Sequence, residues 1–150
     1  MDEDYYRSTI SNIVTQECSF ERSLLARHCD CSKSHRFNLA EREGIRCEAG
    51  LRNKNCLRLK DFLRESVSFT FHIKDNNEKL PYAKQIKMQA GGLLSLQKLL
   101  SSNDAESTKV KDVHQLVIDL EKQYSDYRQI PMMDILKEIS TFKVRHRPKF

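Results

Sequence analysis

The sequence predicts a mainly α-helical protein, a compact bundle-like array of five to seven helices. Its 150 residues include only four glycines and three prolines, so few positions interrupt regular structure. Apolar residues recur at the spacing of a helix face through most of the chain. A chain of this length can bury a core of its own. We therefore expect one domain over 1–150, with a cysteine-bearing half (1–64) and a helical half (81–150).

The first half is expected to contain short helices joined by polar loops. Apolar spacing predicts helices over 4–17 and 20–28, whereas residues 29–37 are polar and follow no period. Asn38, with a glutamate three residues later, resembles a capping box, in which both side chains satisfy free amides at a helix start. The sequence therefore predicts a short helix over 39–46.

A longer helix is predicted over 56–66, after a loop at 48–55. The next segment, 67–73, is ambiguous because it alternates between apolar and polar types, which is a strand pattern. Two interpretations stay open. The helix continues to residue 73, or a minor two-stranded β element pairs 66–74 with 141–146.

The second half is expected to form three amphipathic helices, over 81–101, 110–124 and 131–142. The first and the third open with a proline, which is favoured at a helix start. Gly91 and Gly92 lie inside the first helix, where each glycine costs about 0.5–1 kcal/mol relative to alanine. Such a pair is tolerated where the helix kinks, or where another backbone or a ligand must come close.

The cysteines carry the clearest chemical signal. All five lie within the first 56 residues, as Cys18, Cys29, Cys31, Cys47 and Cys56. An iron–sulfur cluster needs thiolates but does not need them close in sequence, and helix ends can bring four of them around a [4Fe–4S] cube. We therefore expect a small metal-binding accessory or regulatory protein that holds such a cluster for electron transfer, sensing or structural support.

The ligand set stays partly open at this point. Four cysteines at predicted element ends, Cys18, Cys29, Cys47 and Cys56, are the expected ligands, with Cys31 as a replacement for Cys18. Zinc is the alternative metal, although the chain lacks the Cys-x2–4-Cys knuckles of structural zinc sites. A third interpretation has no metal, because reduced cysteines also behave as small buried hydrophobes.

The charge distribution suggests an alternative function. The net charge is +5, and basic residues concentrate in two segments, 22–64 and 137–150. If these segments meet, they form a positive face for nucleic acid or for an acidic protein partner. The residues expected on that face are Arg52, Lys54, Arg58, Lys60, Lys143, Arg145, Arg147 and Lys149.

Enzyme activity is not predicted. The sequence contains no nucleophile-elbow, phosphate-loop or dinucleotide-binding glycine motif. The first residues are acidic and do not resemble a secretory signal, and no apolar run is long enough for a membrane span. We therefore expect a cytoplasmic protein that does not enter the membrane, in a compartment where thiols stay reduced.

Overall fold

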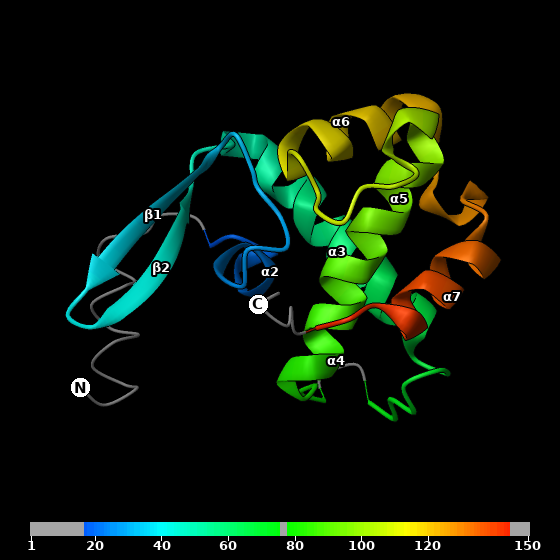
Figure 1. Ribbon diagram of the computed structural model, residues 1–150, viewed down its shortest axis with the longest axis horizontal. Coiled ribbons are helices and arrows are strands. Elements are labelled where there is room, and N and C mark those ends of the chain that lie inside the picture. Colours follow the sequence, from blue (N-terminus) through cyan, green and yellow to red (C-terminus); the bar gives the residue numbers. More distant parts are fainter. Residues whose placement is uncertain (1–16, 76–77, 145–150) are drawn as a thin grey trace, which may run out of the picture.

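Helices pack side by side in this protein, and one β-hairpin projects from them (Figure 1). The computed structural model describes residues 17–75 and 78–144. Its regular elements are α2 (Glu21–Leu25), β1 (Ser34–Leu39), β2 (Arg42–Cys47), α3 (Asn53–Val67), α4 (Tyr82–Ile86), α5 (Gly92–Leu100), α6 (Val113–Gln123) and α7 (Met132–Thr141). Short 3-10 turns occupy Gly50–Arg52, Ser102–Asp104 and Tyr127–Gln129, and a π-helical turn occupies Lys87–Gly91. The prediction of a mainly α fold with a minor two-stranded β element is confirmed.

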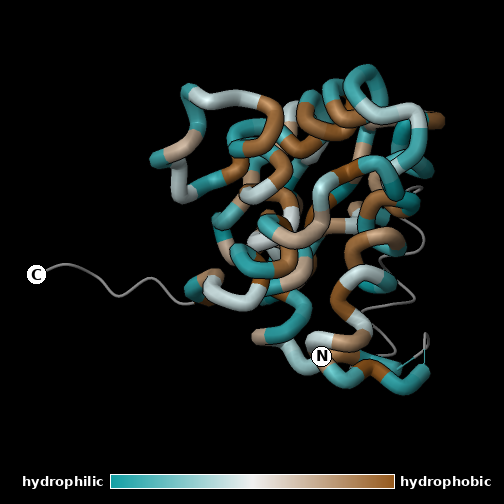
Figure 2. Tube along the Cα trace, turned by 90° about the vertical axis from the view of Figure 1, so that its right-hand side faces the viewer, coloured by the Kyte–Doolittle hydropathy of each residue, from teal (hydrophilic) through white to brown (hydrophobic). Residues whose placement is uncertain are grey.

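Most of the predicted helices lie where the periodicity placed them. In the structure α2 lies within the predicted range 20–28, and α3 covers the whole of the predicted range 56–66. The helices α6 and α7 lie close to their predicted bounds. The helix predicted over 4–17 falls almost entirely outside the described residues. Apolar and polar positions alternate along the helices (Figure 2), as expected for amphipathic helices that share one core.

The β element lies elsewhere than predicted. Residues 39–46 form no helix, because β1 and β2 pair antiparallel from Ser34 opposite Cys47 to Leu39 opposite Arg42. The expected capping box is only a local signal, and two tertiary features override it. Ala40 adopts a positive φ of 55° in the turn, and Ile45 is buried with 1% exposure.

The proposed pairing of 66–74 with 141–146 is wrong for the residues that the structure describes. The helix interpretation is closer, since α3 ends at Val67 and the backbone then turns, with Phe71 N–H donating to the Val67 carbonyl over 2.8 Å. A half-buried strand would place alternate residues on one face, yet Phe69 is 91% exposed while Phe71 is 8% exposed. At the other end α7 reaches Thr141, and residues 145 and 146 lie outside the described part.

The core forms where α3, α5, α6 and α7 meet. The side chains that close it are fully buried: Leu59, Leu63, Ile86, Leu93, Leu96, Leu120, Ile135 and Ile139. In the described ranges, 17–75 and 78–144, no helix has the length and apolar character to cross a membrane.

Two adjacent glycines allow the central helical segment to approach its neighbours. A Cβ added at Gly91 would lie 3.1 Å from the Cα of Ile139 in α7. One added at Gly92 would lie 2.9 Å from a methyl carbon of Leu63 in α3. The predicted close approach of another backbone at this pair is therefore found, and it coincides with the π-helical turn.

This close approach predicts that Gly91→Val destabilises the protein by about 1–3 kcal/mol, because the new side chain must displace the α7 backbone. Equilibrium denaturation measures the change. The control is Lys137→Val, at an exposed position within α7, which should shift the free energy of unfolding by about 0.5 kcal/mol or less. Equal effects of the two substitutions would contradict the proposed contact.

Candidate metal centre

The loop after α2 is fixed by backbone pairing with the segment that leads into α6. Val110 N–H donates to the His28 carbonyl over 3.1 Å, and Asp30 N–H donates to the Val110 carbonyl over 3.0 Å. Val113 N–H donates to the Asp30 carbonyl over 2.8 Å. Cys29 thus lies in a parallel bridge opposite Val110, although the two are far apart in sequence.

One carboxylate joins this loop to the start of α6. Asp112 Oδ1 accepts the backbone N–H of His114 over 3.1 Å, which caps the helix. The same oxygen accepts the backbone N–H of Ser32 over 2.9 Å. Cys31 is the neighbour of Ser32 in the chain, so it is held at the N-terminus of α6.

Four of the five cysteines line one pocket, which we call the thiol pocket. Each comes from a different place in the fold: Cys18 precedes α2, Cys31 precedes β1, Cys47 ends β2, and Cys56 lies in the first turn of α3. Apolar side chains of Phe20, Leu24 and Val113 also line it, together with the polar residues Lys33, Ser34, Asn53 and His114. The hairpin register explains part of this convergence, since Cys47 lies opposite Ser34.

Backbone amides point at three of these sulfurs. Ala49 N–H donates to Cys47 Sγ over 3.5 Å. The N–H groups of Phe20 and Lys33 donate in the same way to Cys18 and Cys31 and lower the pKa values of these two thiols. In each case the donor follows its cysteine by two residues. Amide donors stabilise a thiolate, and hydrogen bonds to ligand sulfurs are a recurring feature of iron–sulfur sites.

Burial has the larger effect on the pKa values and acts in the opposite direction. Burial, with a smaller contribution from the neighbouring thiols, raises the pKa of Cys18 and of Cys56 to about 12. Burial also raises the pKa of Cys31. Cys18, Cys31 and Cys56 are therefore protonated at neutral pH in the metal-free pocket, and a metal must displace these protons to bind.

Cys29 is placed differently from the other four. Its side chain is 0% exposed and belongs to the hydrophobic core, whereas the pocket cysteines are half-buried. Burial, followed by the charge of Asp30, raises its pKa to about 12. The sequence groups Cys29 with Cys47 and Cys56 and leaves Cys18 or Cys31 as the fourth ligand. The structure brings Cys18 and Cys31 together on the thiol pocket, and Cys29 lies outside its lining.

Zinc also accepts histidine, but the two histidines that lie among the cysteines in the sequence, His28 and His35, have other partners. His28 Nε2 donates to the Val144 carbonyl over 3.0 Å, and its ring packs edge-on against Phe142. His35 Nε2 lies 2.9 Å from a carboxylate oxygen of Glu48 on the exposed hairpin. Within the described residues, no group of three or more His, Cys, Asp or Glu side chains meets the spacing needed to hold a metal ion.

The residues of the predicted basic face are spread over several elements. Arg52 lies beside the thiol pocket and pairs with Glu121 over 3.4 Å. Lys54 and Arg58 are exposed on α3, and Lys60 is half-buried. Lys143 is exposed near the end of the described chain, and three of the predicted residues fall outside it: Arg145, Arg147 and Lys149.

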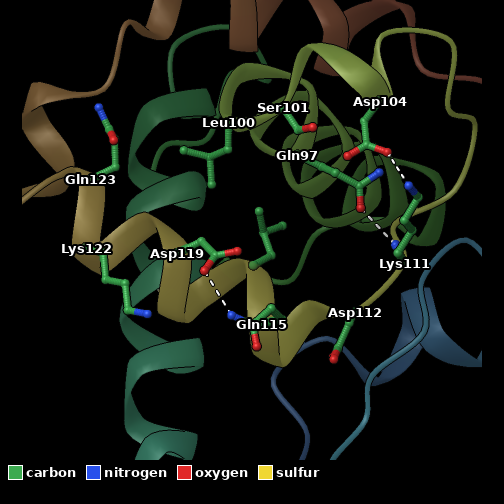
Figure 3. A pocket seen from close by; sticks show the side chains of 11 residues that line it. Gln97, Leu100, Ser101, Asp104, Lys111, Asp112, Gln115, Asp119, Lys122 and Gln123 are labelled. Carbon is green, nitrogen blue, oxygen red and sulfur yellow. Dashed lines mark hydrogen bonds and ion pairs between the residues drawn. The ribbon is translucent and has the colours of Figure 1, made fainter.

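A second, larger hollow of about 380 Å³ lies between the end of α5 and α6 (Figure 3). Its polar side chains largely satisfy one another. Lys111 Nζ lies 2.6 Å from Asp104, and the Lys111 N–H donates to Gln97 Oε1 over 2.8 Å. Gln115 donates to Asp119 over 2.9 Å, as the dashed lines in Figure 3 mark. These internal bonds leave the hollow with little chemistry directed at a ligand.

The chain matches no protein-family model, and no curated protein or solved structure gives a significant match. The functional argument therefore depends on the geometry of the thiol pocket.

The raised thiol pKa values predict that alkaline pH destabilises the metal-free protein. Cys18 and Cys56 stay protonated in the folded state up to about pH 12, whereas unfolded thiols ionise near their ordinary pKa of 9.0. The unfolded state gains from this ionisation, so the free energy of unfolding should fall as the pH rises from 9 towards 12. Denaturant titrations at pH 7 and pH 10 measure the fall. The double variant Cys18→Ala/Cys56→Ala should show a smaller one, and an unchanged fall would contradict the assignment.

Proposed function

We propose that this protein is a small metal-binding accessory or regulatory protein whose Cys18, Cys31, Cys47 and Cys56 hold an iron–sulfur cluster. One observation carries the proposal: four cysteines from four different parts of the fold line a single pocket. Ligation by four cysteine thiolates is the common mode for [2Fe–2S] and [4Fe–4S] clusters. Three of the four, Cys18, Cys31 and Cys56, also pack against the hydrophobic core, whose buried members are mainly other side chains.

The described residues do not show the close set of ligands that a single zinc ion needs. With Zn–S bonds of about 2.3 Å, tetrahedral geometry holds four sulfurs about 3.8 Å apart. The described part of the chain has no three ligand-type side chains that meet single-ion geometry. Four cysteines from separate elements that line one pocket are compatible with a polynuclear cluster, which four thiolates commonly hold.

The surroundings of the pocket also suit a cluster. Thiolate ligands and inorganic sulfide carry negative charge, which the backbone amides of Phe20, Lys33 and Ala49 would stabilise. Lys33 adds a cationic side chain at the lining. The apolar side chains of Phe20 and Leu24 limit access of water. A bound cluster would supply one-electron chemistry or a covalent cross-link between the elements.

Exposure favours a sensing or electron-exchange role over a purely structural one. All four pocket cysteines are half-buried, so solvent and small oxidants reach the rim. Accessible thiolate ligands are typical of sites that respond to oxidants, and solvent exposure also tunes the reduction potential. All five cysteines are free thiols, which suits a reducing compartment such as the cytoplasm.

The proposal predicts that alanine at any one of the four pocket cysteines abolishes or strongly lowers cluster binding, because each supplies one ligand. Protein purified or reconstituted without oxygen should be brown, absorb near 400 nm and contain about four iron and four sulfide ions per chain. Iron and sulfide analysis of each single variant measures the loss.

Cys29→Ala provides the matched control. It removes a thiol that is buried near the pocket but does not line it, so its iron content should equal that of the wild type. If Cys29→Ala loses its iron and Cys31→Ala keeps it, the ligand set first expected from the sequence is restored. A colourless protein that binds one zinc ion through the same four cysteines would overturn the cluster in favour of a zinc site.

A further inference from the structure

An exposed stripe of two leucines and two basic residues runs along the start of α3. The 3-10 turn Gly50–Arg52 passes into α3 without a break, since Arg52 and Asn53 both have helical φ and ψ values. Residues three or four apart on such a segment are neighbours on one face. Leu51, Lys54, Leu57 and Arg58 therefore form one continuous stripe, which we call the docking stripe.

The composition of this stripe is unfavourable for an isolated surface. Leu51 is 85% exposed and Leu57 is 45% exposed, although both are large apolar side chains. Lys54 and Arg58 are also exposed, and like charges four residues apart on a helix repel each other. The exposed apolar surface and the repulsion between the two bases are both unfavourable in the isolated protein. A partner that covers the leucines and neutralises the bases would remove both costs.

The docking stripe lies on the outer side of the turns that carry the thiol pocket. Ala49, Asn53 and Cys56, which belong to the same stretch of chain, face the other way and line the pocket. An α-helix is about 10–12 Å across with its side chains. A molecule bound to the stripe would therefore lie within about one helix diameter of the proposed cluster.

We propose that the docking stripe binds an acidic protein partner, one that presents carboxylates around an apolar patch. The role of that partner, to exchange electrons or to receive a redox signal from the cluster, rests on the proposed function, whereas the binding itself does not. Charge complementarity supports an acidic surface, with Lys54 and Arg58 as its counterparts and Asp61 marking the end of the basic section. Arg52, next to the stripe, already pairs with Glu121.

A protein fits the stripe better than a nucleic acid. Nucleic-acid surfaces combine basic residues with aromatic rings on which bases stack, and the stripe contains no aromatic residue. A phosphate backbone also gives no reason for two exposed leucines. Interfaces between proteins typically bury apolar side chains at the centre and place charges around them.

The test uses a synthetic fluorescein-labelled helical peptide of glutamates and leucines as the probe and the full-length, iron-loaded protein. Fluorescence anisotropy should detect binding that weakens with added salt. The variant Lys54→Glu/Arg58→Glu should weaken binding about tenfold or more, because it reverses both charges of the stripe. The matched control Lys79→Glu/Lys137→Glu reverses two exposed charges elsewhere and should change affinity by about twofold or less.

The leucines are tested with their own control. Leu51→Ser/Leu57→Ser should weaken peptide binding, whereas Met133→Ser, which removes a side chain that is 86% exposed on α7, should not.

Quenching of the bound fluorescein tests the position of the stripe. It should be stronger with the iron-loaded protein than with the metal-free protein, and binding without any difference in quenching would overturn the placement.

The remaining outcomes separate the two proposals. A brown protein whose peptide affinity does not respond to the stripe variants overturns the docking surface and leaves the cluster standing. A colourless protein that still binds the peptide through the stripe overturns the cluster alone. Tighter, stripe-dependent binding of a labelled single-stranded oligonucleotide would assign the surface to nucleic acid and overturn an acidic protein as the occupant. A dimer that is detected by sedimentation and dissociated by Leu51→Ser would assign the surface to a second copy of this chain and overturn an acidic protein as the occupant.

Discussion

The thiol pocket depends on the pairing between the loop after α2 and the segment that enters α6. Three backbone hydrogen bonds and the shared carboxylate of Asp112 hold this loop in place. The position of Cys31 at the start of the hairpin follows from it. The hairpin register then sets Cys47 opposite Ser34, and the short connection through Gly50–Arg52 brings Cys56 into the first turn of α3. One non-local contact thus decides where at least three thiols lie.

The two halves of the protein are stabilised by different means. The helical half buries many large apolar side chains between α5, α6 and α7, which is the dominant favourable contribution to folding. The described part of the cysteine-bearing half has fewer of these: Phe20, Leu24, Ile45, Leu59 and Leu63. Burial raises the pKa values of Cys18 and Cys56, so without a cation these two sulfurs stay neutral at pH 7. A metal that displaces those protons would couple binding to folding of this half, as it does in small metal-binding domains.

The sequence predicted what periodicity and clustering can encode. The helices α3, α6 and α7 follow from apolar spacing, and the convergence of several cysteines follows from their concentration in one part of the chain. The hairpin was missed because Asn38 gives a local helix-start signal, while strand pairing depends on Gly44 fitting beneath the Phe37 ring. The exclusion of Cys29 from the thiol pocket could not be predicted from the sequence either. It results from the bridge to Val110, a contact between residues far apart in sequence that no local spacing reports.

The first turns of α3 connect the site to the surface in a way that a flexible loop could not. Cys56 faces the thiol pocket, and its neighbours Leu57 and Arg58 face solvent. A helix is a rigid element, and α3 is anchored in the core by Leu59 and Leu63. A change of charge at a ligated sulfur would therefore act on the docking stripe through a fixed separation of about one Debye length, where salt screens electrostatic interactions only in part. The same rigidity means that a bound partner would alter the electrostatic environment of the pocket, so the coupling between site and surface is reciprocal.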